Sequence, residues 1–230
     1  MTTSHTTTPT TETRGRITPS LGANLQAFTR QTWAGARVLL GLTLLLGVAY
    51  PLAVTGVGQL VFPWQANDSL LAADGSHVNS IAAGGAHGGT IGSALIGQSF
   101  DGPTWFHPRP SGAGKGYDTL ASAGSNLGPN NPDLLAAVNK LRAAVATEEG
   151  VDPAAVPADA ITASGSGLDP DISPAYARLQ VARVAAARNV SADKVAALVE
   201  MSTQGRTLGV LGEPRVNVLR LNLALATIGQ

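Results

Sequence analysis

The sequence predicts a small α/β (or α+β) extracytoplasmic domain that is anchored by one N-terminal transmembrane helix. Three observations predict this architecture. No charged residue occurs from Val38 to Asn67. Charged residues make up 13% of the chain, which is about half of the ~25% usual in soluble domains. Beyond the charge-free run, short strand patterns and segments of helical periodicity follow one another.

The apolar run over residues 38–62 predicts the transmembrane helix. About 20 apolar residues, each adding ~1.5 Å, cross the hydrocarbon core, so the run is long enough even when tilted. Pro51 lies within it, and membrane helices tolerate proline better than soluble helices do. The buried helix of a soluble protein and a cleaved signal peptide are the alternatives. The run is longer than either requires, and it lacks a clean small-x-small cleavage site followed by a polar start.

The charges before the run predict its orientation. They are four arginines and one acid, at Arg14, Arg16, Arg30, Arg37 and Glu12. Basic flanking segments stay in the cytoplasm. Residues 1–37, which begin with a threonine-rich stretch, are therefore expected to be a disordered polar cytoplasmic tail. Residues 63–230 are expected to form the extracytoplasmic domain.

The domain is predicted to combine capped helices, short strands and one long loop. The loop extends from Asp101 to Asn131, where Gly, Pro, Ser and Asn are crowded. Asn131 and Pro132 form the cap and first turn of a helix that ends near Glu149. Three further elements are a strand over residues 93–96, a helix from Ser173 to about Arg188, and a helix capped by Ser191 and stopped by Gly205. The last element is either a strand from Val216 to about Leu221 or a strand that passes into a closing helix.

Composition excludes several classes of function. The chain has no cysteine, so disulfides and thiolate chemistry are unavailable. The formal net charge is zero, and no basic nucleic-acid-binding face is seen. His77, His87 and His107 are too irregularly spaced for a recognisable metal site, and no HExxH motif supports them. His107, in "WFHPRP", is expected to hydrogen-bond locally, and no metal ligand is predicted.

The segment "SGAGKG", residues 111–116, has the ingredients of a phosphate-binding loop but not its spacing. A Walker loop needs Gly-Lys followed by Ser or Thr, and a further glycine five positions before the Gly-Lys pair. Gly116 occupies the hydroxyl position, and Arg109 occupies the position of the first glycine. The segment is therefore interpreted as a surface loop in which Lys115 is tolerant of substitution.

No catalytic residue is predicted. A serine hydrolase of the α/β type would need a G-x-S-x-G elbow, which the sequence lacks. The segment "TASGSGLDP", residues 162–170, fits a turn, although its amides could form an anion-binding nest. No pair of carboxylates stands out.

Eight segments, taken in order between Tyr50 and Ala226, resemble the KdpC family of the bacterial potassium-transporting Kdp ATPase. They are "YPL", "GQLVFPWQAN", "GSALIGQSF", "FHPRPS", "ASAGSNLGPNNPDL", "TASGSGLDPDISP", "VARVAAARN" and "GEPRVNVLRLNLAL". Three features depart from the family pattern. The tail before the anchor is longer, the glycine-rich stretch over residues 82–89 resembles an insertion, and Ala123 stands where the family tends to carry glycine. Alanine at that position disfavours a left-handed backbone there.

The resemblance implies an accessory, non-enzymatic subunit of a high-affinity, ATP-driven potassium uptake complex in the bacterial inner (plasma) membrane. The implied partners are a potassium-translocating channel-like subunit, a P-type ATPase catalytic subunit and a very small subunit. Members of the family assemble the complex and act as a catalytic chaperone that raises the ATP affinity of the catalytic subunit. Potassium is the ion that the complex transports, and no firmly bound cofactor is expected.

Some descriptions of the family place a contact with ATP in the serine–glycine segment. The candidates for it here are Ser122, Gly124, Ser125 and Asn126. The orientation predicted from charge puts this segment across the bilayer from cytosolic ATP, which favours an indirect effect through coupling between sites. The residues of the family segments that are candidates for partner contacts are Pro51, Trp64, Gln65, Gln98, His107, Arg109, Asn126, Asn131, Asn217 and Asn222. A membrane-anchored binding or scaffold module, or a hydrolase, unrelated to potassium is the alternative.

Overall fold

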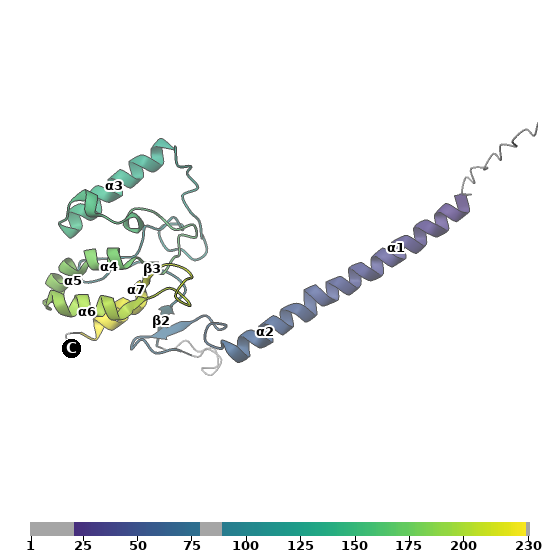
Figure 1. Ribbon diagram of the computed structural model, residues 1–230, viewed down its shortest axis with the longest axis horizontal. Coiled ribbons are helices and arrows are strands. Elements are labelled where there is room, and N and C mark those ends of the chain that lie inside the picture. The colour runs from purple at the N-terminus through teal and green to yellow at the C-terminus, as the bar shows by residue number, and fades with distance from the viewer. Residues whose placement is uncertain (1–20, 79–88, 229–230) are drawn as a thin grey trace, which may run out of the picture. The chain divides into compact units, whose positions relative to one another are not determined.

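The computed structural model describes residues 21–78 and 89–228. The first 20 residues of the expected tail and residues 82–88 of the glycine-rich stretch lie outside the described residues. The chain divides into two compact units, one up to Val57 and one from Gly58 onward. The first unit is helical, and the second mixes helices with short strands (Figure 1).

The described part of the first unit is a single continuous helix in three parts. They are α1 (Leu21–Leu44), the π-helical η1 (Leu45–Ala49) and α2 (Tyr50–Val61), whose last turn belongs to the second unit. The π-helical turn ends two residues before Pro51, where the helix has to adjust because proline has no amide hydrogen and its ring clashes with the carbonyl four residues earlier. The expectation of a disordered tail up to residue 37 is wrong for residues 21–37, which extend the helix toward the N-terminus.

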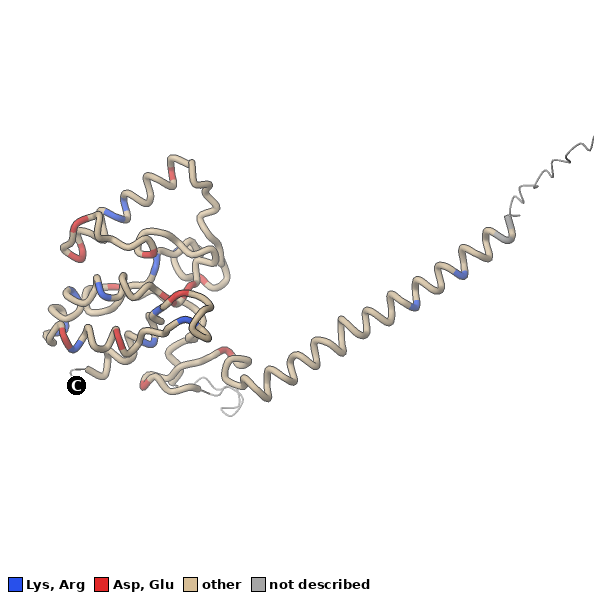
Figure 2. Tube along the Cα trace, in the orientation of Figure 1, with Lys and Arg blue, Asp and Glu red and all other residues tan. Residues whose placement is uncertain are grey.

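Residues Asn24–Val61 are the one helix of the described chain that is long and apolar enough to cross a membrane, with a mean hydropathy of 2.1 over its most apolar window. None of that window is buried against the rest of the chain. Figure 2 shows basic residues in α1 and none in α2. The helix therefore has the charge pattern that the sequence indicated, with its C-terminal part free of charge.

A two-stranded antiparallel sheet opens the second unit. It pairs β1 (Leu70–Ala72) with β2 (Thr90–Ser93). The strand expected over residues 93–96 is therefore displaced toward the N-terminus. Ser93 ends the strand because its side-chain oxygen accepts a hydrogen bond from the Leu95 amide and its carbonyl accepts one from the Ile96 amide, which closes a turn.

The helices of the second unit begin near the expected caps. In α3 (Pro132–Glu149), the Asn131 side chain accepts from the Asp133 amide, and Gly150 ends the helix in a left-handed conformation. Two short 3-10 turns follow, η2 (Pro153–Ala155) and η3 (Ala158–Ala160). The helix expected from Ser173 to Arg188 is instead two, α4 (Pro174–Leu179) and α5 (Val181–Arg188), with Gln180 at the break.

A three-stranded antiparallel sheet joins the last elements. Its order is β3 (Asp171–Ile172), β5 (Arg215–Asn217) and β4 (Thr203–Gln204). Helix α6 (Ala192–Ser202) stops at Ser202 rather than at Gly205, because Thr203 and Gln204 pair with β5. The alternative of a strand that passes into a closing helix is confirmed, since α7 (Val218–Ala226) follows β5 directly.

The core of the second unit lies where α4 to α7 meet the three-stranded sheet (Figure 1). It is built mainly from aliphatic side chains, of which the fully buried ones include Val184, Val195, Val199, Val216, Leu221 and Leu225. The segment between Asp101 and Asn131 contains no helix or strand, as the sequence predicted. A loop of this length has to satisfy its backbone polar groups through other partners.

Candidate functional site

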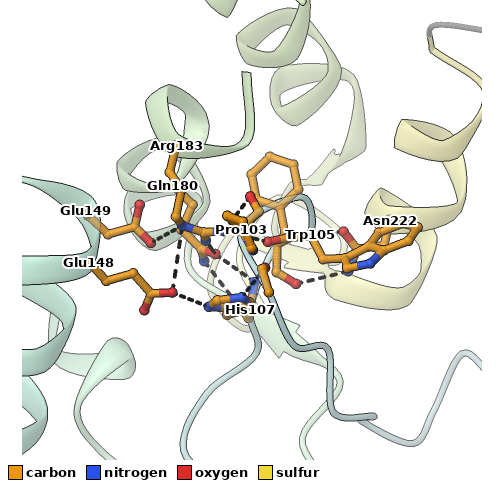
Figure 3. A network of polar contacts seen from close by, with 10 residues as sticks. Pro103, Trp105, His107, Glu148, Glu149, Gln180, Arg183 and Asn222 are labelled. Atoms are coloured by element: carbon orange, nitrogen blue, oxygen red, sulfur yellow. Dashed lines mark hydrogen bonds and ion pairs between the residues drawn. The ribbon is translucent and has the colours of Figure 1, made fainter. Parts of the chain in front are cut away.

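Residues 102–107 of the long loop, here called the clamped loop, are held by polar side chains from α5, from α7 and from the break between α4 and α5 (Figure 3). Two side-chain amides each bind both the N–H and the C=O group of one loop residue, and these two loop residues are consecutive. Asn222 of α7 accepts from the Phe106 amide and donates to the Phe106 carbonyl, both at 2.9 Å. Gln180 does the same for His107, at 2.6 and 3.1 Å. Each amide thus replaces the hydrogen bonds that a neighbouring strand would give.

Two arginines of α5 take up further carbonyls of the clamped loop. Arg183 donates from one nitrogen to the carbonyls of Pro103 and Trp105, both at 2.9 Å. Arg188 donates to the Thr104 carbonyl at 2.7 Å, and its guanidinium lies 4.5 Å from the centre of the Trp105 ring. The guanidinium groups of both arginines therefore donate hydrogen bonds to the loop.

A carboxylate pair at the end of α3 completes this network (Figure 3). Glu149 accepts from Arg183 at 3.0 Å, and only 1% of its side chain is exposed. Burial raises the pKa of Glu149 above its ordinary value, and the nearby Arg183 charge opposes that rise. His107 makes a local hydrogen bond with the Gly102 carbonyl at 2.8 Å, as expected, and lies 3.3 Å from Glu148.

Arg109 follows the clamped loop and links it to the segment before β3. Its guanidinium donates to Asp169 at 2.7 Å and to the Thr162 carbonyl at 3.3 Å. The Tyr117 hydroxyl donates to the Arg109 carbonyl at 2.7 Å, and burial raises the pKa of Tyr117. Arg109 also borders an open cavity of about 420 Å³ whose other charged residues are Asp159, Asp169, Asp171, Glu213 and Arg215.

Most of the charged side chains around this cavity have hydrogen-bond or ion-pair partners within the domain. Asp159 accepts from the Ser173 amide and hydroxyl at 2.7 and 2.9 Å. Asp171 lies 3.1 Å from Arg215 and accepts from Asn217. Burial nevertheless raises the pKa of Asp171. Within the described residues, no group of three His, Cys, Asp or Glu side chains has the arrangement of a metal site.

The candidate serine–glycine segment packs into a junction of three loops, here called the glycine junction and formed by residues 111–114, 122–126 and 164–167. Ser122 donates to the Ser166 carbonyl at 2.9 Å, and Ser111 donates to the Gly167 carbonyl at 2.6 Å. A Cβ on Gly124 would lie 3.0 Å from the Gly165 carbonyl oxygen. One on Gly167 would lie 2.6 Å from two backbone atoms of the other loops. These glycines therefore permit a close approach of backbones.

The four candidates for an ATP contact occupy different settings. Gly124 is half-buried in the glycine junction. Ser122 belongs to the same junction through its bond to the Ser166 carbonyl, but Ser122, Ser125 and Asn126 are exposed. Asn126 adopts a left-handed conformation with φ of 53°, whereas Ala123 keeps a negative φ, in agreement with the expectation for alanine.

The other candidates for partner contacts are dispersed over the chain. Asn131 caps α3, and Asn217 caps α7 while donating to the Ala94 carbonyl. The Gln98 side chain covers Gly92 of β2. Gln65 is exposed just after the apolar helix, which contains Pro51, and Trp64 donates to the Leu70 carbonyl at 2.9 Å. His107, Arg109 and Asn222 are the candidates that the structure brings together around the long loop.

Sequence reasoning missed several members of these networks. They are Ser111, Tyr117, Glu149, Asp169, Gln180, Arg183 and Arg188. A signal was present for Arg183, because it lies between the buried Val181 and Val184 in α5 and a cation so placed needs partners. Among the described residues, no serine hydroxyl is hydrogen-bonded to a histidine. The networks described above are suited to fixing a long loop and the surface that the loop presents.

Comparison with known proteins identifies relatives along most of the chain. The family model described as "KdpC: K+-transporting ATPase, c chain" matches residues 32–227. The potassium-transporting ATPase KdpC subunit of Kineococcus radiotolerans is 56% identical over 196 residues, which cover 85% of this chain and 93% of that protein. The KdpC subunit of Mycobacterium tuberculosis is 54% identical over 198 residues, covering 85% and 97%. That of Caulobacter vibrioides is 55% identical over 192 residues, covering 83% and 90%.

Proposed function

Because this chain belongs to the KdpC family of the K+-transporting ATPase, we propose that it serves that ATPase as a non-catalytic accessory subunit. The observation that carries the proposal is the extent of the family match. Residues 32–227 include the apolar helix from residue 32 onward and the whole described domain apart from its last residue. The alternative of a scaffold or hydrolase unrelated to potassium is not favoured.

In this proposal the apolar helix crosses the membrane once, with the N-terminus in the cytoplasm and the domain outside. The helix over residues 24–61 has 38 residues, which at ~1.5 Å each exceed the ~30 Å of the hydrocarbon core. The surplus at its N-terminal end carries Arg30 and Arg37. Basic residues favour the cytoplasmic side, so this end would project there.

The subunit raises the ATP affinity of the catalytic subunit without itself contacting nucleotide. The proposal is supported by the use of the serine–glycine segment in the glycine junction, where Ser122 and Gly124 contact protein backbone. It is also supported by the orientation argued from charge, which would put ATP and the domain on opposite sides of the bilayer. A coupling free energy between two sites requires only that binding at one changes the equilibrium at the other.

The partners in this proposal are the potassium-translocating channel-like subunit, the P-type catalytic subunit and the small subunit. A single transmembrane helix cannot by itself line an ion pathway, because its polar backbone groups are already used within the helix. The apolar helix therefore packs beside multispan subunits, and the domain covers the extracytoplasmic entrance for potassium.

Co-purification tests the accessory role. The tagged full chain is extracted with mild detergent from potassium-starved cells, and it is expected to bring with it a multispan subunit and a P-type ATPase subunit. Complexes prepared without this chain should show a raised KM for ATP with little change in the rate at saturating ATP. Purification of the chain alone from native membranes would contradict the proposal.

Protease treatment of intact spheroplasts tests the orientation. A protease added outside is expected to digest the domain and to leave a protected fragment that contains α1. Protection of the domain would reverse the orientation and make a direct ATP contact the better explanation.

A further inference from the structure

A cluster of three side chains follows the end of the apolar helix and is not used by the networks around the long loop. The Trp64 and His77 rings are stacked, with centroids 3.9 Å apart and planes inclined by 11°. The Arg220 guanidinium lies over the Trp64 ring, 5.3 Å from its centroid. One of its nitrogens is 3.4 Å from the His77 ring nitrogen Nε2. The cluster thus combines an indole, an imidazole and a cation.

Arg220 forms no ion pair within the described part of the domain, although its charge is near enough to Asp171 to act on the pKa of that carboxyl. Five other arginines are paired with carboxylates, Arg109, Arg178, Arg183, Arg206 and Arg215, whereas Arg142 and Arg188 are paired with no described carboxylate. A guanidinium presents a planar fork of donors that matches the oxygens of phosphate, and it stacks readily on aromatic rings. Arg220 is therefore oriented by Trp64 while donors remain for a ligand.

A cavity lies beside this cation. It measures about 330 Å³ and is lined by Arg220, Asn217, Asp74, Gln204 and Met201 among others. Ligand pockets in proteins start at about this size, ~300 Å³. Asp74 is exposed in this lining, and its pKa is lowered by hydrogen bonds from Ser76. Water weakens the attraction between this exposed carboxylate and Arg220.

The chain path places the cluster close to the end of the apolar helix. Trp64 comes three residues after Val61, the last residue of α2. Within the second unit, the Gln59 and Asn67 side chains exchange two hydrogen bonds, at 2.8 and 3.3 Å. Tryptophan at the end of a membrane helix favours the level of the lipid headgroups. The source of phosphate at that level is the membrane itself.

We propose that Arg220, positioned by Trp64 and His77, binds the phosphate of an anionic phospholipid headgroup. The inference rests on the proposed membrane anchoring. A bound lipid would tie α7 and the β1–β2 hairpin, which carry Arg220 and His77, to the membrane surface. The unpaired cation is what favours an anionic lipid over a zwitterionic one.

Native mass spectrometry of the full chain in detergent micelles tests the proposal. With added phosphatidylglycerol, the wild-type chain is expected to retain a lipid adduct, and with phosphatidylcholine to retain far less. Arg220→Gln should weaken phosphatidylglycerol retention about tenfold, since hydrogen bonds to charged groups are among the stronger ones. Arg220→Lys, which keeps the charge but loses the fork, should give an intermediate loss.

The matched control is Arg178→Gln, which removes the same charge from an exposed arginine paired with Glu200. It should retain phosphatidylglycerol as the wild type does. An equal loss in both variants, or equal retention of the two lipids by the wild type, would overturn the proposal. Competition by inorganic phosphate as effective as by lipid would show a soluble-anion site and would also overturn it.

Two further measurements separate this inference from its premises. Resistance of the chain to extraction from membranes by alkaline carbonate reports the anchoring alone, and Arg220→Gln should not change it. Circular dichroism of each variant reports folding, and Trp64→Phe provides a second variant in which the cation keeps an aromatic neighbour. Trp64→Phe is expected to lose part of the lipid retention, and a wild-type level in both Trp64→Phe and Arg220→Gln would contradict the assignment.

Discussion

The clamped loop and the glycine junction are neighbouring loop regions that are held in opposite ways. The clamped loop is fixed by long polar side chains, because Asn222, Gln180 and Arg183 form hydrogen bonds with its backbone. The glycine junction is fixed by the absence of side chains, because Gly124 and Gly167 let backbones touch. The first arrangement depends on hydrogen bonds and charge, and the second depends on space. Substitutions that affect one mechanism should therefore leave the other unaffected.

The largest effect is expected from Arg183→Ala in the clamped loop. The change leaves the Glu149 carboxylate buried without its cation and removes the donor for two loop carbonyls. Breaking a buried ion pair from one side costs about 3–5 kcal/mol in free energy of unfolding. Chemical denaturation of the full chain in detergent, followed by near-ultraviolet circular dichroism, measures it. Arg178→Ala, in an exposed ion pair, is the control and should change little.

The next effect is expected from Gly167→Ala in the glycine junction. Gly167 has φ of +69°, and a Cβ there would lie 2.6 Å from backbone atoms of residues 113 and 123. The left-handed conformation and the overlap together should cost about 2–3 kcal/mol. Gly128→Ala is the matched control, since nothing lies within 4 Å of its Cβ position. Equal stability of the two variants would show that the three loops do not depend on close approach.

Glu149 and Glu200 are expected to change the stability of the domain with pH in opposite directions, which tests the role of Glu149 at the clamped loop. The pKa of Glu149 is raised by burial, so the folded chain holds its proton more tightly than the unfolded chain does. The stability that this group contributes is full below the ordinary glutamate pKa and is lost as pH rises through the raised pKa. Glu149→Gln should therefore flatten the fall in melting temperature over that range.

For Glu200, the change of stability with pH is expected to have the opposite sign. Its pKa is lowered by hydrogen bonds from Arg178, so its contribution is present above the ordinary glutamate pKa and is lost as pH falls through the lowered one. Glu200→Gln should flatten the acid side of the melting profile only. If both variants changed the melting profile only below the ordinary glutamate pKa, the assignment of Glu149 as the buried partner of Arg183 would be contradicted.

Local signals made much of the fold predictable from the sequence. Asn131 with Pro132, and Ser173 with Pro174, marked helix starts because a cap and a first-turn proline act within a few residues. The break at Gln180 was not predictable, because its cause is a pair of hydrogen bonds to His107, 73 residues away. Likewise, α6 ends where pairing with β5 begins, which no residue near Ser202 announces.

Only part of the candidate site was predictable from the sequence. Asn222, His107 and Arg109 were marked by the family resemblance. Their partners Gln180, Arg183 and Asp169 come from other segments and were not marked by any local motif. In the serine–glycine segment, the sequence did not show that Gly124 packs closely against the backbone of another loop. Glycine permits close backbone packing as well as close approach of a ligand, so the local pattern does not distinguish the two.

The smallest effect is expected from Lys115→Ala, at the edge of the glycine junction. Lys115 is exposed, and the turn around it is closed by backbone bonds from Gly116 and Asp118 to the Ala113 carbonyl. Those bonds do not involve the lysine side chain. Potassium uptake by cells at limiting potassium, and the KM of the complex for ATP, should stay within about the wild-type range, because surface substitutions away from such features change little. Arg109→Ala, which breaks the ion pair with Asp169 next to the same loop, provides the contrast. A large loss of ATP-driven uptake in Lys115→Ala alone would show that this lysine contacts a ligand or a partner, and the loop would then have to be counted as part of the functional surface.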